Sequence, residues 1–430
     1  MKRAIVLSGG GTKGAYELGV WKALREKETE FHIVTGTSIG AINGAMMCTG
    51  DYEKCCNMWE NMVMEDLMND GITVTNTMED FYNNKKPLGP FLRKYFKRGG
   101  IDNSPFTDFV RKNISEEKVR SSKVEYGLVT VKQKGLFPCC LSRQEIPQGK
   151  LKDFVIASSS IYPVFPIHEI DGEPYLDGCY YDNLPIDLAF RLGATDVIAV
   201  DMHTLPQHPN YADRPYVTYL TPSRELGGVL DFDPERIKSN IRAGYRDAMR
   251  KFGKYKGFTY SFYPESLKKY RRSAERFCLM IARSEAVIME RDTSKLEKAG
   301  DLHRIFQLFQ KGTGRKELKK EDYFLRAAEL CGEVYEISSE EIYDMSDYAR
   351  KLLSRIKTVD AYPDAGIFAN ISQRGIIKRL MDLKLQNEVE YLTGCLYYAL
   401  RSDTLSLNDR AQILALLPQE TAAAMFLTAL

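Results

Sequence analysis

Residues 4–14 read AIVLSGGGTKG, and an amphipathic segment over residues 15–25 follows directly. The four apolar residues at the start predict a short buried strand, and the glycines predict a tight turn. Leu18, Trp21 and Leu24 recur at helical spacing, so the segment after the turn is predicted to be a helix. A buried strand, a glycine turn and a helix in this order are typical of an α/β fold.

The same alternation continues over the first 200 residues. Further strands are predicted over 32–35, 124–131, 135–141, 174–176 and 195–201, with helices over 39–47, 150–158 and 185–192. Apolar strands that alternate with helices predict a mostly parallel sheet covered by helices on both faces. After about residue 260 helical patterns dominate, including a helix to about Ile356 that a Ser338–Glu341 capping box would open. We therefore predict one domain over 1–258 and a helical one over 259–430.

The composition is that of a globular protein. The chain has 430 residues, of which 44% are hydrophobic and 27% charged, and its formal net charge of +2 gives no reason to expect a nucleic-acid partner. The apolar run over 4–7 is too short for a signal peptide, and no stretch predicts a transmembrane helix. The nine cysteines lack metal-site spacing, which favours free thiols in a reducing, cytoplasmic compartment.

The glycine turn over residues 8–14 places backbone N–H groups at the start of a helix, where they favour an anion. Two chemistries use such a turn. Gly9, Gly11 and Gly14 fit the spacing G-x-G-x-x-G of phosphate binding, and the same amides could form an oxyanion hole. Dinucleotide binding also needs an acid at the end of the second strand, and residues 35–37 contain none. A tight turn without a ligand is the third interpretation.

Residues 36–40 read GTSIG and lie between the second predicted strand and a helix of small residues. That context, together with glycines two residues before and after Ser38, is what the G-x-S-x-G nucleophile elbow requires. The elbow would lift the hydroxyl of Ser38 off the edge of the sheet. The alternative is a glycine-rich turn in which Ser38 only caps the helix.

A serine nucleophile needs a proton acceptor. Asp177 and Gly178 follow a short predicted strand, and an aspartate at a strand end can turn its carboxylate into a cleft. An ordinary Asp-Gly turn has the same sequence. His203 is a further candidate, because Ser38, Asp177 and His203 follow one another in the chain order Ser-Asp-His.

Taken together, these motifs resemble those of the patatin-like phospholipases, over about residues 4–255. Residues 9–15 look like the glycine-rich oxyanion motif of that family, residues 36–40 like its nucleophile elbow, and Asp177-Gly178 like its Asp-Gly motif. Residues 157–166 are similar to the segment that precedes this aspartate. One position departs from the pattern, because Cys179 stands where Gly or Ala is usual.

The resemblance implies a three-layer α/β/α patatin-like domain with a mostly parallel sheet, followed by an α-helical C-terminal region as in bacterial relatives. It implies a lipid acyl hydrolase, of phospholipase A or esterase type, that works without a metal or another cofactor. Ser38 would be the nucleophile and Asp177 the base of a catalytic dyad. The implied oxyanion donors are Gly10, Gly11 and Thr12, and the implied supporting residues are Gly9, Lys13, Gly14, Gly36, Gly40 and Gly178.

Two other functions stay open. One is a serine esterase or thioesterase with a Ser38–Asp177–His203 triad, and the other is an idle module that binds an anion or a nucleotide. Lipid is the expected partner, and a basic stripe of Lys238, Arg242, Arg246 and Arg250 is a candidate membrane contact, although a solvated face of a surface helix is the preferred explanation of the stripe. A Met-rich helix from Met58 to Met68 could contact acyl chains, although packing in the core is the preferred interpretation. Residues 70–103 are either a lid over the site or a surface excursion without a role in access.

Overall fold

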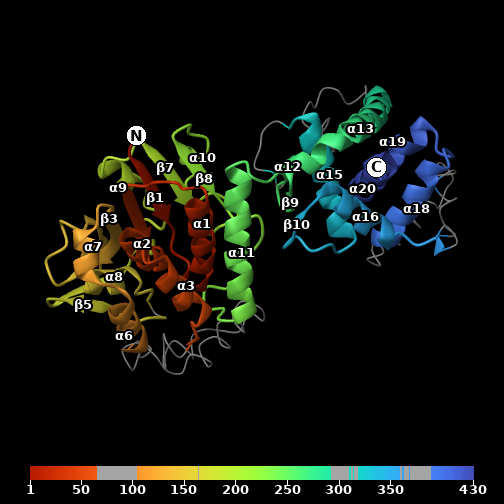
Figure 1. Cartoon of the computed structure of the whole chain (residues 1–430). Coiled ribbons are helices and arrows are strands. Elements are labelled where there is room, and N and C mark those ends of the chain that lie inside the picture. The colour runs from red at the N-terminus through yellow and green to blue at the C-terminus, as the bar shows by residue number, and fades with distance from the viewer. Residues whose placement is uncertain are drawn as a thin grey trace. The chain divides into compact units, whose positions relative to one another are not determined.

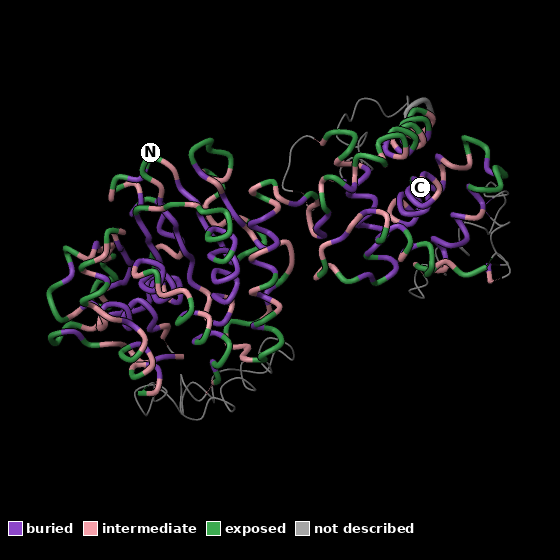
Figure 2. Tube along the Cα trace, in the orientation of Figure 1, coloured by how far each residue is buried: buried purple, intermediate pink, exposed green. Residues whose placement is uncertain are grey.

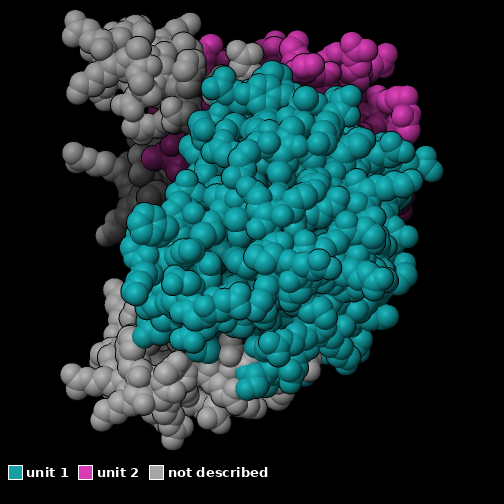
Figure 3. Space-filling model, turned by 90° about the vertical axis from the view of Figure 1, so that its left-hand side faces the viewer, with its two compact units in different colours: residues 1–251 teal, residues 252–430 magenta. Residues whose placement is uncertain are grey.

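The computed structural model describes residues 1–64, 104–162, 164–291, 309–310, 313, 318–358, 361–362, 368 and 389–430. The chain divides into two compact units, Met1–Lys251 and Phe252–Leu430, which Figure 3 colours separately. The predicted domain boundary between residues 258 and 259 lies a few residues after this division. Residues 70–103, the hypothetical lid, and Met68 lie outside the described residues.

Eight described strands of the first unit form one sheet. They are β1 (Arg3–Leu7), β2 (Ile33–Thr37), β3 (Glu125–Lys132), β4 (Phe137–Ser142), β5 (His168–Ile170), β6 (Glu173–Asp177), β7 (Asp196–Val200) and β8 (Val217–Leu220). Five of them are parallel, in the order β3-β2-β1-β7-β8, whereas β4 and β6 pair with β3 and β5 with β6 in antiparallel fashion. The predicted mostly parallel sheet is confirmed. Strands β5 and β8 were not predicted.

Helices cover both faces of this sheet (Figure 1). They are η1 (Gly11–Gly14), α1 (Ala15–Glu26), α2 (Ile39–Thr49), α3 (Tyr52–Glu60), α6 (Ser104–Asn113), α7 (Glu116–Ser121), η3 (Lys134–Leu136), α8 (Leu151–Ser158), η4 (Gly178–Tyr180), α9 (Ile186–Arg191), α10 (Pro209–Ala212) and α11 (Pro234–Lys251). Ala4 and Val6 of β1 pack with Ile186 and Ala189 of α9 on one face. On the other face, Gly44 of α2 lies against Leu7. The strands between these layers are buried (Figure 2) and the predicted three-layer α/β/α class is confirmed.

The second unit is helical, as predicted. It contains β9 (Ser261–Phe262), α12 (Pro264–Leu267), η5 (Lys268–Tyr270), α13 (Arg271–Arg291), α15 (Lys320–Val334), β10 (Ile342–Tyr343), α16 (Met345–Arg355), α18 (Val389–Arg401), α19 (Leu407–Leu416) and α20 (Pro418–Ala429). Helix α20 is buried almost all round, and its Phe426 ring lies 4.9 Å from that of Phe324 in α15. A helix that is apolar on every side belongs in a core. No helix in the described ranges combines the length and the apolar character needed to cross a bilayer.

One predicted surface is wrong in part. The basic stripe of α11 is not a single exposed face, because Arg246 is only 5% exposed and the side chain of Arg250 is buried in an ion pair with Asp247. The same carboxylate accepts hydrogen bonds from the Tyr16 hydroxyl and the Ser223 amide. Helix α11 packs closely on α1 along this line, so only Lys238 and Arg242 remain on the outside.

Candidate active site

The register of the sheet brings Ser38 and Asp177 together. Strand β2 runs beside β3 until Thr37 stands opposite Val129. Strand β6 runs beside β3 in the opposite direction, and its last residue, Asp177, stands opposite Thr130. Because Val129 and Thr130 are consecutive, the ends of β2 and β6 meet head to head along one side of β3.

Ser38 occupies a sharp turn between β2 and α2. Its backbone has φ 55° and ψ −126°, which is rare for a residue with a side chain. The turn brings the two flanking glycines into contact, since a Cβ on Gly36 would lie 2.2 Å from the Gly40 carbonyl oxygen. The strained, close-packed geometry that the G-x-S-x-G string requires is therefore present.

The hydroxyl of Ser38 donates a hydrogen bond to Asp177, with 2.8 Å between Oγ and Oδ2. Asp177 is only 1% exposed, and its Oδ1 accepts the backbone N–H of Cys179 at 2.8 Å. Burial raises the pKa of Asp177 to about 6, although the hydrogen bonds from Cys179 and Ser38 oppose the shift. A carboxylate with this pKa can accept a proton near neutral pH and give it back easily.

The glycine turn lies next to this pair, because a Cβ on Gly9 would come within 3.0 Å of the Ser38 Cβ. The N–H groups of Gly10 and Gly11 form no hydrogen bond with any described residue, so both are available to an oxyanion. The expectation that Thr12 is a third oxyanion donor is wrong, because its N–H already donates to the Val229 carbonyl at 2.9 Å. Lys13 is half-buried and makes no ion pair within the described part of the chain.

Thr12 instead ties a loop to the glycine turn. Its hydroxyl donates to the Gly228 carbonyl at 3.0 Å and accepts the Asp231 N–H at 3.2 Å. The loop approaches so closely that a Cβ on Gly11, whose φ is +59°, would lie 2.0 Å from the Val229 oxygen. Only glycine fits at this position, both for its backbone angle and for the space. Thr12 is thus a structural anchor of the site.

Two serines at the end of α8 bind the backbones of Ser38 and Asp177 by hydrogen bonds. They are Ser158, the last residue of the helix, and Ser160 just after it, and the sequence patterns did not single them out. The buried Ser158 hydroxyl accepts the N–H of Ser38 at 3.0 Å and donates to the Val129 carbonyl at 2.7 Å. The Ser160 carbonyl accepts the N–H of Asp177 at 3.1 Å. Both serines lie in residues 157–166, the segment quoted for its family resemblance, which was the available signal.

Asn183 holds the glycine turn from the other side. Its carbonyl accepts the Gly9 N–H at 3.0 Å, and its Nδ2 donates to the Gly9 oxygen at 3.2 Å and to Gln207 Oε1 at 3.0 Å. A side-chain amide that pairs with a backbone in this way fixes the position of the turn relative to Ser38. No sequence motif pointed to this residue.

His203, the alternative base, pairs with a different carboxylate. Its Nδ1 lies 3.1 Å from Oδ1 of Asp201, a buried residue that also accepts the Tyr219 hydroxyl at 2.7 Å. The hydroxyl of Ser38 contacts Asp177 directly, without an imidazole between them. Among the residues that the structure describes, no group of three His, Cys, Asp or Glu side chains could hold a metal ion.

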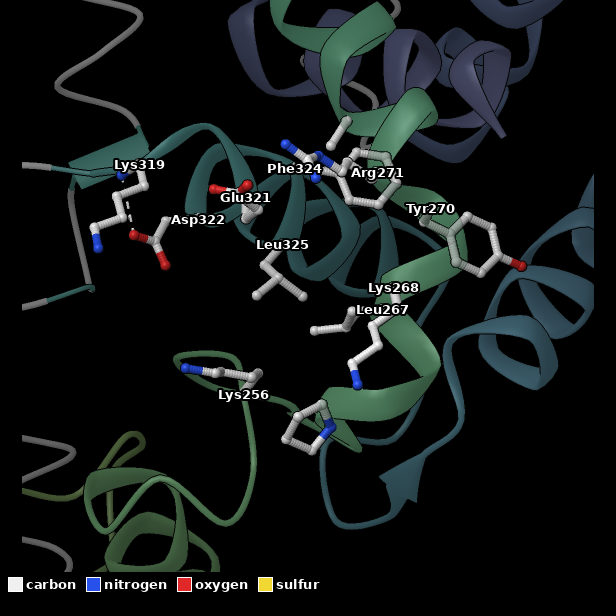
Figure 4. Close-up of a pocket in the computed structure, with 12 residues that line it drawn as sticks. Lys256, Leu267, Lys268, Tyr270, Arg271, Lys319, Glu321, Asp322, Phe324 and Leu325 are labelled. Carbon is white, nitrogen blue, oxygen red and sulfur yellow. Dashed lines mark hydrogen bonds between the residues drawn. The ribbon is translucent and has the colours of Figure 1, made fainter.

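A separate pocket of about 730 Å³ lies in the second unit and contains none of these residues (Figure 4). Leu267 and Leu325 form part of its apolar floor, and Lys256 and Lys319 stand at its rim. Helix α15 begins beside it, with the Asp322 carboxylate accepting the N–H of Lys319. The pocket is of the size of a small-molecule site, but it holds no nucleophile or base pair comparable to Ser38 and Asp177.

The fold and the site together define an α/β protein with a serine elbow, a paired aspartate and a glycine turn with free amides. Comparison with known proteins shows which family this part of the chain is similar to. Residues 5–190 match the family model described as patatin-like phospholipase. The resemblance read from the motifs is confirmed over these residues.

Individual relatives are distant and longer. A patatin-like phospholipase domain-containing protein of Caenorhabditis elegans, M110.7, is 27% identical over 46% of this chain and 16% of its own length. The human patatin-like phospholipase domain-containing protein 6 is 27% identical over 46% of this chain and 13% of its own length. This chain thus spans less than a fifth of these curated relatives. The solved structure of VipD from Legionella pneumophila covers 98% of this chain and 91% of its own, at 13% identity and a TM-score of 0.40, too low to carry a functional argument.

Proposed function

We propose that the first unit is a lipid acyl hydrolase, of phospholipase A or esterase type, in which Ser38 and Asp177 form a catalytic dyad. The observation that carries the proposal is the 2.8 Å contact between the Ser38 hydroxyl and the buried Asp177 carboxylate at a strained elbow. The family of the domain supports lipid as the substrate class.

In the proposed first step, Ser38 Oγ attacks the ester carbonyl carbon while its proton moves to Asp177 Oδ2. The carbonyl oxygen takes up the negative charge and is bound by the N–H groups of Gly10 and Gly11. Collapse of this intermediate breaks the ester bond, and the departing alcohol takes the proton from Asp177. The acyl chain is then bound to Ser38 as an ester.

In the second step, Asp177 accepts a proton from water, and the resulting hydroxide equivalent attacks the acyl-enzyme carbonyl. The bond to Ser38 Oγ breaks, the serine recovers its proton from Asp177, and the fatty acid leaves. A single carboxylate thus acts as base and acid in turn. General acid–base catalysis of this kind is typically worth about 10²–10⁴-fold in rate.

Hydrolysis of a lipid panel and labelling by a fluorophosphonate probe test this assignment. We expect Ser38→Ala to abolish both, Asp177→Asn to lower turnover by about 10²–10⁴-fold, and His203→Ala to retain most activity. Ser159→Ala is a matched control, because this buried serine only donates to the Val155 carbonyl of its own helix.

The alternatives predict other results. A triad esterase would lose its activity in His203→Ala, and a thioesterase would prefer acyl thioesters over lipid esters. An idle binding module would neither hydrolyse lipid nor react with the probe as wild type. We further propose that residues 259–430 govern stability, access or assembly and not bond cleavage. The cytoplasmic location remains a prediction from the cysteine pattern.

A further inference from the structure

Two consecutive large apolar residues are exposed at the tip where the β3–β4 turn leads into β4. Leu136 and Phe137 are each 64% exposed, although most large apolar residues of this unit are buried. The backbone of the turn is unusual as well, with φ of +76° at Gly135 and +52° at Leu136. A bulky residue in the left-handed region is rare, and such outliers cluster at functional sites.

This tip belongs to the edge of the sheet that carries the candidate active site. Asp177 stands opposite Thr130, and β3 continues for two further residues to Lys132, which pairs with Phe137. At about 3.3 Å per residue, the strand therefore ends about 7 Å beyond the level of Asp177. The β3–β4 turn thus lies beyond the end of β2 that Ser38 follows, at the same edge of the sheet.

Further amphipathic side chains surround Asp177. Tyr180, the last residue of η4, and Tyr181, which follows it, are 49% and 59% exposed. Tyrosine is enriched where one end of a side chain meets an apolar phase and the other meets water. The two tyrosines and the β3–β4 tip therefore offer exposed aromatic and aliphatic side chains near the dyad.

The charges near the tip are mixed. Lys132 and Lys134 flank the turn, and neither forms an ion pair within the described part of the chain. The neighbouring β5–β6 hairpin carries the exposed acids Glu169 and Glu173. Since these acids offset the lysines, attraction to anionic headgroups is a weak driving force here, and apolar burial is the stronger one.

We propose that Leu136 and Phe137 insert into the surface of a phospholipid aggregate and hold the Ser38–Asp177 edge against it. The proposal rests on the proposed function, because a hydrolase of membrane lipids has to bring its nucleophile to the headgroup boundary. It replaces the basic stripe of α11, half of which is buried, as the surface that meets lipid.

A tryptophan reporter tests insertion directly. The two natural tryptophans, Trp21 and Trp59, are buried, so vesicles are not expected to change their emission. Phe137→Trp adds an exposed fluorophore at the tip. With phosphatidylcholine vesicles, its emission is expected to shift to the blue, and brominated acyl chains are expected to quench it. The shift should persist at 0.5 M NaCl, because apolar burial is not screened by salt. Emission that stays unchanged and unquenched would overturn the proposal.

A matched pair of double variants measures the contribution of the tip. Leu136→Gln/Phe137→Gln is expected to weaken vesicle partitioning at least tenfold, and Leu353→Gln/Leu407→Gln, which removes exposed leucines from the second unit, should leave it unchanged. Equal partitioning of both would contradict insertion, as would self-association through the tip in the absence of vesicles.

Two readouts separate this proposal from the proposed function. The tip variant should hydrolyse a soluble short-chain ester at the wild-type rate, because neither residue belongs to the dyad or the glycine turn. Ser38→Ala should bind vesicles as well as wild type does. If Ser38→Ala keeps full hydrolysis, the dyad is refuted while the vesicle data still decide the role of the tip.

Discussion

Asp177→Asn is expected to stabilise the protein at neutral pH although it lowers turnover strongly. The carboxyl is almost fully buried, and burial raises its pKa from 3.8 to about 6. A group with a raised folded pKa binds its proton more tightly in the folded state. Its contribution to stability is therefore complete below about pH 4 and is lost as the pH rises through 6. Since a pKa shift of one unit corresponds to about 1.4 kcal/mol, the wild-type protein loses about 3 kcal/mol of unfolding free energy by pH 8.

Asparagine is neutral at every pH and nearly isosteric, so it avoids this loss. Its Oδ1 can still accept the Cys179 N–H that Asp177 accepts now. Urea denaturation of wild type and Asp177→Asn between pH 4 and 8 measures the difference, which we expect to grow with pH toward about 3 kcal/mol. Asp108→Asn, at an exposed carboxyl of α6, is the control and should show no such trend. A gap that is equal at pH 4 and pH 8, or a variant less stable than wild type at pH 8, would refute the reasoning.

Three further predictions concern the supports of the site and the packing of α11 on α1. Ser158→Ala removes the acceptor of the Ser38 N–H and should lower kcat at least tenfold without moving the acid limb of the pH profile, whereas Ser159→Ala should not. Gly244→Ala should lower the unfolding free energy by about 1–3 kcal/mol in chemical denaturation, because its Cβ would lie 2.0 Å from the backbone of α1. Thr12→Val removes both hydroxyl bonds to residues 226–231, so hydrogen exchange in this loop should become faster.

Local patterns predicted most elements of the first unit and failed where distant segments pair. The Ser338–Glu341 capping box was wrong, since α16 begins at Met345 and Asp344 caps it by accepting the Ser346 N–H. The intervening residues of β10 pair with β9, about 80 positions earlier in the chain, and no local pattern reports such a contact. The α11 stripe failed for a similar reason, because Asp247 and α1 bury part of a face that looks uniformly basic in the sequence.

In the candidate site too, local motifs were predictable from the sequence, whereas the pairing of distant strands was not. The elbow and the Asp-Gly turn were recognisable as sequence motifs. Their proximity in space depends on β3, because Thr37 and Asp177 stand opposite two consecutive residues of that strand. Ser158 and Asn183 bind residues that are far away in the sequence, so no characteristic spacing of residues predicts their role.

The one departure from the family motif follows from the same geometry. Gly178 cannot carry a side chain, because its Cβ would lie 2.2 Å from the Val129 carbonyl oxygen. Cys179, in contrast, serves the site through its backbone N–H, which any residue except proline provides. Its side chain is half-buried, and burial raises the pKa of the thiol, so the thiol stays protonated beside Asp177. A small neutral residue is therefore sufficient at this position, and cysteine meets that requirement as glycine and alanine do.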